Sequence, residues 1–163
     1  MHRRTALAAL ALPLAASAQT AATPPVINKV EVGTLLPEFD AEWAGPARPA
    51  GASRLMLIDF WATWCAPCLE HFPFLNLLAQ GYASSGVEVL AMTKEPGSTV
   101  LPFLSSRPVK FHVGYGGSRQ LQERLKVNAM PYSLLVGADR KVLWGGYPNA
   151  KLPLLIEQAL KPA

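Results

Sequence analysis

The stretch LMLIDFWATWCAPC, residues 55–68, carries the strongest structural and chemical signals in this chain. Its first six residues, Leu55 to Phe60, are apolar apart from Asp59, which is typical of a central parallel strand buried on both faces. It ends in Cys65 and Cys68, the only two cysteines among the 163 residues. Any thiol chemistry of the chain must therefore take place here.

A helix and a second strand are predicted to follow the cysteines. From Ala66 to Ala83, apolar residues recur every three or four positions, as in a helix with one apolar face. Pro73 lies inside this segment and should kink it, because proline cannot donate the helical hydrogen bond. Val87 to Met92 is again apolar. Strand, helix and strand together form a βαβ unit.

The remaining sequence predicts further helices and strands, and so an α/β fold. Weak alternation favours an edge strand at Val26–Val32, and composition favours a loop over residues 44–53. The later predicted elements are a helix within Gly97–Arg107, a strand at Val109–Val113, a helix at Ser118–Leu125 with Ser118 as N-cap, strands at Tyr132–Val136 and Val142–Tyr147 joined by a hairpin turn at 137–141, and a helix at Ala150–Leu160.

The bulk composition fits one globular domain. With 163 residues, 50% of them hydrophobic and 16% charged, the chain is long enough for one sizeable core. The formal charge of +4 comes from scattered basic residues, without the Lys/Arg cluster or the aromatic-basic repeat that nucleic-acid binding needs. We therefore expect no nucleic-acid partner.

Residues 1–18 are predicted to be a cleaved signal peptide. A basic start and an apolar run precede the small-residue cleavage site Ala16-Ser17-Ala18. An uncleaved anchor and an ordinary buried helix are the alternatives, although the run is shorter than the roughly 20 residues of a spanning helix. An arginine pair near the start leaves open both general and twin-arginine export. Residues 19–35 would be a tether and N-terminal extension, and residues 36–163 the folded domain, exported to the periplasm where disulfides persist.

A C-x-x-C pair between a strand and a helix is the arrangement that a dithiol redox site needs. The helix N-terminus presents unpaired N–H groups and a partial positive charge, which favour a thiolate at Cys65. The thiolate is the reactive nucleophile. Two intervening residues allow Cys68 to close a disulfide, and Pro67 stiffens the turn. Cys65 is therefore predicted to attack a partner disulfide, and Cys68 to resolve the mixed disulfide.

Two other uses of the cysteine pair fit less well. Zinc takes four ligands, and the predicted exported part offers only the pair plus His71 and His112. A purely structural disulfide across two residues would remove little loop entropy and so stabilise the fold weakly. The pattern favours redox chemistry with no metal and no cofactor besides the Cys65–Cys68 disulfide.

The segment DFWATWCAPC, residues 59–68, with Pro73 downstream, resembles the thioredoxin superfamily, and most closely its TlpA/ResA-like exported branch. A second match, VNAMPYSLLV at residues 127–136, resembles the cis-proline loop of that family and its following strand. DRKVLWGGY at residues 139–147 resembles the next hairpin. The match covers roughly residues 36–160, with the motifs in the family's order and spacing. It implies a thioredoxin fold, with a mixed central sheet and helices on both faces.

The resemblance implies roles at the matched positions. Pro131 would carry a cis peptide bond, face the disulfide and expose the backbone of Met130 for pairing with an extended partner segment. A simple strand-start proline is the alternative. Trp61 is expected in the core. The residues expected to contact a partner are Trp64, Ala66, Pro67 and Met130.

Two residues are candidates for proton transfer. Asp59 interrupts an apolar strand, where burial should raise its pKa. In thioredoxin a buried acid at this position accepts a proton from the resolving thiol, so Asp59 is predicted to serve Cys68. Many TlpA/ResA-like proteins instead place a glutamate six residues after the first cysteine, where this chain has His71. His71 lies on the helix face of Cys68, where it either tunes the thiols or is a solvated or packing histidine. His112 is expected to be structural.

These features predict an exported thiol-disulfide oxidoreductase that acts as a reductase on partner proteins. The resemblance implies partners such as apocytochrome c or copper-site thiols, and recharging by a membrane electron donor of the DsbD or CcdA type. We expect a monomer. Two other classes stay open. A peroxiredoxin-like peroxidase would have a different cysteine context from W-C-x-x-C, and a copper-binding assembly factor usually has a C-x-x-x-C pair with a distal histidine.

Overall fold

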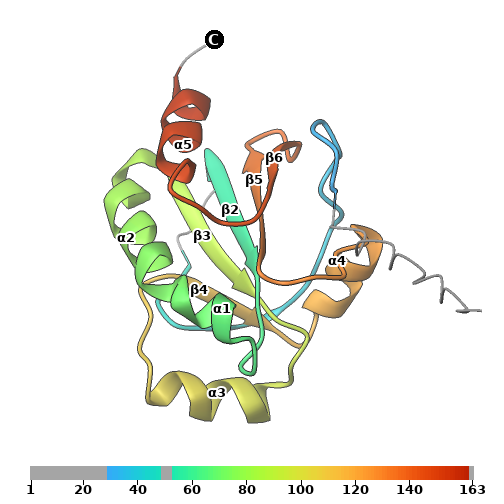
Figure 1. Cartoon of the computed structure of the whole chain (residues 1–163), viewed down its shortest axis with the longest axis vertical. Coiled ribbons are helices and arrows are strands. Elements are labelled where there is room, and N and C mark those ends of the chain that lie inside the picture. Colours follow the sequence, from blue (N-terminus) through green and yellow to red (C-terminus); the bar gives the residue numbers. More distant parts are fainter. Residues whose placement is uncertain (1–28, 49–52, 162–163) are drawn as a thin grey trace, which may run out of the picture.

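The computed structural model describes residues 29–48 and 53–161, which form a mixed sheet flanked by helices (Figure 1). The predicted signal peptide, the tether up to residue 28 and part of the predicted loop at 44–53 lie outside the described residues. None of the described helices is long and apolar enough to cross a membrane.

The six strands lie in the order β1-β4-β3-β2-β5-β6. Their bounds are β1 Glu42–Ala44, β2 Leu55–Phe60, β3 Val87–Met92, β4 His112–Tyr115, β5 Tyr132–Gly137 and β6 Val142–Gly146. The helices are α1 Ala66–Glu70, α2 Phe72–Tyr82, α3 Gly97–Ser105, α4 Ser118–Arg124 and α5 Leu152–Leu160, with a 3-10 turn, η1, at Ala83–Ser85. The predicted strands Leu55–Phe60 and Val87–Met92 are confirmed residue for residue. The hairpin and the helices α4 and α5 agree with their predictions to within two residues at each end, and α3 begins at Gly97, three residues before the Val100 at which its core was predicted.

Strand β2 has a hydrogen-bonded neighbour on each side. It runs parallel to β3, with Asp59 opposite Ala91, and antiparallel to β5, with Asp59 opposite Ser133. Every residue of β2 except Met56 is buried. The continuous apolar run is explained by this position, because a strand covered on both faces has no solvent side on which polar residues could alternate.

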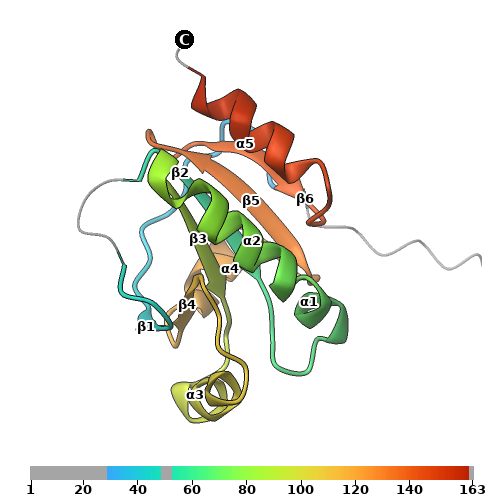
Figure 2. The same cartoon turned by 90° about the vertical axis from the view of Figure 1, so that its left-hand side faces the viewer.

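The two faces of the sheet pack against different elements. One core, which we call the cysteine-side core, joins Leu57 of β2 to apolar residues of α2, α3 and α5 and contains both cysteines. The other, the α4-side core, joins Ile58 and Phe60 to Leu121 of α4 and to the N-terminal segment. Figure 2 shows α2 and α5 in front of the sheet and α4 behind it. The side chains of β2 alternate between the two cores, as the strand period of two requires.

The predicted single helix at Ala66–Ala83 is two helices, α1 and α2, with His71 between them. Pro73 has no N–H to donate and its ring clashes with the carbonyl four residues earlier, so the helical ladder cannot pass through it. The His71 N–H donates to the Cys68 carbonyl at 3.1 Å, and the ladder resumes where the Leu75 N–H donates to the His71 carbonyl at 2.9 Å. The predicted kink is therefore a break.

The edge of the sheet at β1 differs from the prediction. The short strand β1 pairs antiparallel with β4, with Glu42 opposite Tyr115, so Ala44 belongs to a strand and not to the predicted loop. The strand predicted at 109–113 lies instead at His112–Tyr115. The reason is that the Lys110 N–H donates to Asn76 Oδ1 of α2 at 2.6 Å and not to a neighbouring strand.

The strand predicted at 26–32 is wrong over its described part, residues 29–32. The chain turns at Gly33, whose φ of +88° favours glycine. The Gly33 N–H then donates to the Val142 carbonyl at 2.7 Å, and Leu35 forms an isolated bridge with Lys141. The N-terminal segment thus packs along β6 without being a strand.

The predicted N-cap of α4, Ser118, is also wrong, because the helix begins at Ser118 and its N-cap residue is Gly117. A Cβ atom at position 117 would lie 1.7 Å from the carbonyl oxygen of Asp40. Only glycine allows the two backbone segments to approach this closely.

Asp59 is the one ionisable side chain of the central strand. It is fully buried, and its Oδ1 accepts a 2.5 Å hydrogen bond from the Ser133 hydroxyl of β5. Burial raises the pKa of Asp59 from 3.8 to about 7, and the hydrogen bond from Ser133 opposes this rise in part. The carboxyl group is therefore largely neutral in mildly acidic solution, in accord with the predicted effect of burial.

We predict that Asp59→Asn raises the stability of the oxidised protein at alkaline pH. The folded protein holds the Asp59 proton up to about pH 7 and the unfolded chain only to about pH 4, so the folded state binds more protons between these values. The free energy of unfolding should therefore fall as pH rises through this window and level off above it. Asparagine does not ionise, so the variant should keep this stability. For a pKa rise from 3.8 to about 7, the free energy of unfolding at pH 8 should be higher in the variant by up to about 4 kcal/mol.

Urea unfolding of both oxidised proteins from pH 4 to pH 8 measures this difference. The two stability curves should converge near pH 4 and separate toward pH 8. Curves that stay parallel over this range would contradict a raised pKa of Asp59.

Candidate redox site

Cys65 and Cys68 form a disulfide, with a Cα–Cα distance of 5.3 Å. Cys65 is the N-cap residue of α1, and Cys68 lies in its first turn. The Cys68 N–H donates to the Cys65 carbonyl at 3.0 Å, which closes this turn. Cys65 is 5% exposed and Cys68 is fully buried. Of the two cysteines, only the first therefore has any exposed surface.

The loop between β2 and α1 is held from both sides. The Trp61 N–H donates to the Met92 carbonyl at 3.1 Å, and the Cys65 N–H to the Ala62 carbonyl at 3.1 Å. Between them, Thr63 is held by Glu95 from the loop between β3 and α3: its N–H and its hydroxyl donate to the two carboxylate oxygens, each at 2.7 Å. Glu95 therefore fixes the segment that leads into Cys65, a role that the sequence analysis missed.

The two tryptophans of the motif have opposite environments. Trp61 is fully buried and packs edge-to-face on Phe72 of α2, with 5.0 Å between the ring centroids. Trp64 is 73% exposed beside Cys65. This difference matches the expectation that Trp61 belongs to the core and Trp64 to a surface. Ala66 and Pro67 are exposed as well.

The peptide bond between Met130 and Pro131 is cis, as the resemblance implied. Pro131 is buried, and Met130 is half-buried against both cores, including the one that contains the cysteines. Met130 also lines a cavity together with Trp64. The fold thus brings the segment before Pro131 to the surface around Trp64, although about 60 residues separate them in the sequence.

Asp59 lies on the same side of the sheet as the cysteines. Leu57 and Trp61, two residues before and after it, belong to the cysteine-side core, and so does Leu135, two residues after Ser133. The second carboxyl oxygen, Oδ2, is buried without a hydrogen-bond partner among the described residues. Asp59 therefore has one atom available for a proton within the core that holds the disulfide.

His71 occupies the break between α1 and α2. Its ring packs edge-to-face on Tyr147, which follows β6, with 5.0 Å between ring centroids. Its Nδ1 is buried and, within the described part of the chain, has no hydrogen-bond partner. The ring is half-buried, which excludes a fully solvated histidine, and its described contact is with Tyr147. His112 is structural as expected: its Nδ1 lies 2.9 Å from the Pro46 carbonyl, and its Nε2 lies 3.9 Å from the buried Glu88.

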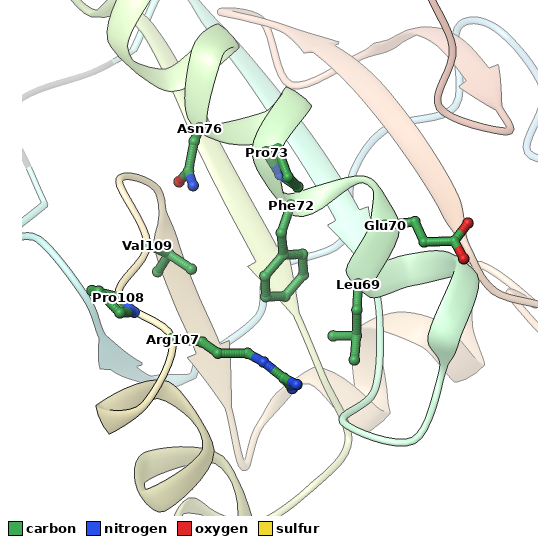
Figure 3. A pocket seen from close by; sticks show the side chains of 8 residues that line it. All are labelled: Leu69, Glu70, Phe72, Pro73, Asn76, Arg107, Pro108 and Val109. Carbon is green, nitrogen blue, oxygen red and sulfur yellow. The ribbon is translucent and has the colours of Figure 1, made fainter.

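Two cavities flank this region. The smaller, of about 260 Å³, includes Trp64, Glu95 and Met130 in its lining. The larger, of about 390 Å³, lies between the α1–α2 helices and the segment that joins α3 to β4, with Phe72 and Arg107 on facing sides (Figure 3). The smaller cavity shares residues with the predicted contact surface, and the larger one does not. In residues 29–48 and 53–161, no three His, Cys, Asp or Glu side chains gather in a way that could hold a metal ion.

Three polar residues at this site were absent from the sequence prediction: Ser133, which donates to Asp59, Glu95, which holds Thr63, and Gln122 of α4, which lines the smaller cavity. Ser133 left a usable signal, because a polar residue two positions after Pro131 interrupts an apolar strand. Glu95 and Gln122 gave no such signal, since each reaches the site only through a loop or helix whose position depends on tertiary packing.

We predict that Glu95→Ala destabilises the oxidised protein by about 1–3 kcal/mol, because the partly buried N–H and hydroxyl of Thr63 lose their acceptors. Glu95→Gln keeps one acceptor oxygen and should lose less. Urea unfolding measures the stability, and amide exchange at Thr63 should quicken in both variants. Glu123→Ala, at an exposed glutamate of α4, is the matched control and should change neither. Equal effects of Glu95→Ala and Glu123→Ala would contradict the anchoring role.

The chain matches the family described as Redoxin over residues 50–157. The thiol-disulfide oxidoreductase ResA of Bacillus anthracis is 32% identical over 120 residues, which cover 71% of this chain and 69% of that protein. The ResA protein of Bacillus subtilis (strain 168) is 32% identical over 89 residues, covering 54% of this chain and 50% of that protein. Both alignments are with proteins named for the chemistry that the cysteine pair predicts.

Solved structures show the same fold. A crystal structure attributed to a thiol:disulfide interchange protein DsbE of Chlorobium tepidum superposes with a TM-score of 0.68 and 27% identity, over 82% of this chain and all of that one. StoA of Bacillus subtilis, at 16% identity, a TM-score of 0.57 and coverage of 67% and 85%, supports the fold alone. With this fold, these relatives and the Cys65–Cys68 pair, the chain belongs to the Redoxin family as a TlpA/ResA-like thiol-disulfide oxidoreductase of the thioredoxin superfamily.

Proposed function

We propose that this oxidoreductase works as a reductase of disulfides in partner proteins, with Cys65 as the attacking residue and Cys68 as the resolving residue. The observation that carries the proposal is the asymmetry of the pair. Cys65 lies at the N-terminus of α1 with a small exposed fraction, and Cys68 is fully buried behind it. A thiolate is favoured at the first position by the helix N-terminus and disfavoured at the second by burial.

The reaction has two exchange steps. The Cys65 thiolate attacks one sulfur of the partner disulfide, so that a Cys65–partner bond forms, the partner's S–S bond breaks and one partner thiolate leaves. The Cys68 thiolate then attacks Cys65 Sγ, the Cys65–Cys68 disulfide forms and the second partner thiolate leaves. Two electrons pass from the protein dithiol to the partner.

The second step needs a proton acceptor, because a buried thiol is a poor nucleophile until it is deprotonated. We propose Asp59 for this role. Its neighbours on the same face of β2, Leu57 and Trp61, belong to the core that contains Cys68. Its Oδ2 has no partner among the described residues, and burial raises its pKa to about 7. A base with a pKa near the working pH is well matched to proton transfer. His71 is the weaker candidate, since its described contact is with Tyr147.

The partner segment is proposed to bind in extended form between Trp64 and Met130. The exposed Trp64 offers a flat apolar surface, and the backbone beside the cis bond at Pro131 can pair with a strand-like segment. Ala66 and Pro67 lie exposed in the first turn of α1 and complete this contact surface.

We further propose that the protein acts after export, in the periplasm, on substrates such as apocytochrome c or copper-site thiols. The support is the signal-like sequence at residues 1–18 and the kinship with ResA and DsbE proteins. Each turnover leaves the Cys65–Cys68 disulfide, so the protein needs a source of two electrons. A membrane donor of the DsbD or CcdA type would supply them.

The proposed division of labour predicts that Cys68→Ala accumulates mixed disulfides. Without the resolving thiol, the Cys65–partner bond cannot be broken from within, so partners should remain attached through Cys65 when the variant is expressed with its export segment. Non-reducing gels followed by mass spectrometry measure the adducts. Cys65→Ala is the matched control and should trap far fewer. Equal trapping by both variants, or none from the exported compartment, would overturn the assignment.

The proposed base predicts a change in the pH–rate profile. For Asp59→Asn, resolution of a preformed Cys65–peptide mixed disulfide should slow by on the order of tenfold or more at neutral pH. The profile should also lose the inflection that titration of Asp59 contributes, because burial raises the pKa of this carboxyl group toward neutral pH. Rapid-quench measurement of peptide release from pH 5 to pH 9 tests both. Ser133→Ala should keep the inflection, because it removes only a hydrogen bond to Asp59. An unchanged profile for Asp59→Asn would exclude Asp59 as the acceptor.

A further inference from the structure

The cavity of about 260 Å³ beside the redox site has a polar wall that the proposed reaction does not use. The cavity includes Trp64, the neighbour of Cys65, and Met130, the neighbour of the cis-proline. A small-molecule site usually measures about 300–1,000 Å³. This cavity lies below that range and suits one side chain of a bound polypeptide.

Gln122 of α4 forms part of this wall although it is only 2% exposed. Its carbonyl accepts a 2.8 Å hydrogen bond from the Val127 N–H, which closes the turn after α4 and fixes the residue in place. Its side-chain Nε2 is buried and has no hydrogen-bond partner among the described residues. Buried polar groups in proteins are nearly always paired. An unpaired carboxamide donor on a cavity wall therefore points to a ligand that brings an acceptor oxygen.

The larger cavity of Figure 3 provides a contrast. None of its lining residues is among those with a buried, unpaired side-chain atom in the described part of the chain. Its asparagine, Asn76, is already used, because Oδ1 accepts the Lys110 N–H at 2.6 Å. Of these two cavities, only the one beside Trp64 is lined by residues with unpaired buried donors in the described part of the chain.

The rest of the lining restricts the chemistry of the occupant. Val127 and Met130 give the cavity apolar walls, which suit an apolar stem. Trp61 lines it as well, and its buried Nε1 is a second donor without a partner among the described residues. Lys94 and Glu95 carry opposite charges on the same lining. Because these two charges leave the pair with no net charge, a charged side chain of either sign would lose its hydration without a net opposite charge in return, which is unfavourable. A neutral side chain with a carbonyl oxygen on an apolar stem avoids this cost and can accept a hydrogen bond from Gln122 Nε2.

We propose that Gln122 is a specificity-determining residue, which selects partner segments that place a glutamine-like carboxamide side chain beside the attacked cysteine. This inference rests on the proposed function, since it assumes an extended partner segment at the site. In such a segment, residues two positions apart point to the same side. The selected side chain therefore lies two positions before or after the partner's cysteine.

The test uses the reduced full-length protein and short peptides whose single cysteine is bonded to glutathione. Each peptide carries glutamine, methionine, glutamate or lysine two positions before the cysteine, and a second set carries them two positions after it. In the reaction the peptide–glutathione disulfide breaks, two thiols leave and the Cys65–Cys68 disulfide forms. The readout is the second-order rate constant for each peptide.

For the wild type, the glutamine peptide of one set should react at least fivefold faster than the matching glutamate and lysine peptides. Gln122→Met removes the donor at similar volume. In this variant the rate constant of the glutamine peptide divided by that of the methionine peptide should fall about fivefold, the change expected when one neutral hydrogen bond is lost. Gln122→Leu provides a second variant, and thermal unfolding verifies that each is folded. Gln120→Met, at an exposed glutamine of the same helix, is the matched control and should keep the wild-type ratio.

Two failures are distinguishable. If the wild type reduces neither the peptides nor a small disulfide such as bis(2-hydroxyethyl) disulfide, the proposed reductase function fails. If the wild type reduces both, the reductase function stands. The role of Gln122 is then overturned by either of two results: equal rate constants of the wild type for all peptides, or a glutamine-to-methionine ratio in Gln122→Met and Gln122→Leu that equals that of the wild type.

Discussion

The burial of β2 on both faces is the constraint on which the rest of the structure depends. Because β3 and β5 pair with it on its two sides, its end is fixed relative to the whole sheet, and the loop that carries Trp64 and Cys65 starts from that end. The same antiparallel pairing places β5, and therefore the cis-proline segment just before it, next to the end of β2: Phe60 lies opposite Tyr132. A redox loop and its partner-binding segment are thus brought together by one strand register.

This arrangement places polar groups where they lower stability. Asp59 Oδ2, Trp61 Nε1, His71 Nδ1 and Gln122 Nε2 are the buried side-chain atoms that lack partners in residues 29–48 and 53–161. An unpaired buried group typically costs about 1–3 kcal/mol. Asp59 and Trp61 belong to the segment 55–68, and His71 donates its N–H to Cys68 of that segment. Gln122 lines the same cavity as Trp61 and Trp64. Such a concentration is expected where a site is shaped for chemistry and binding and not for maximal stability.

The sequence predicted the central strands, the hairpin and a kink at Pro73, which in the structure is a break between α1 and α2, because each has a local cause: an apolar run, a turn composition or a missing N–H. It also predicted the cysteine pair, the cis bond at Pro131 and the buried acid at Asp59. It missed β1, the register of β4, Glu95 and Gln122. These depend on contacts between segments far apart in the chain, such as Lys110 with Asn76 or Thr63 with Glu95, and no local pattern of residues encodes them.

The position of Asp59 also determines how the pH dependence of such a dithiol has to be interpreted. Of Asp59 and Cys68, only the Asp59 carboxyl group titrates in the oxidised protein, because Cys68 is in the disulfide. Burial raises the pKa of this carboxyl group to about 7. In the reduced protein the Cys68 thiol becomes a second ionisable group in the same core, and a negative charge on either group disfavours a charge on the other. The two protons then leave in macroscopic steps that belong to the pair. The proton released by Cys68 and the proton accepted by Asp59 are therefore one coupled equilibrium, and Ser133, which stabilises the carboxylate, influences the thiol through it.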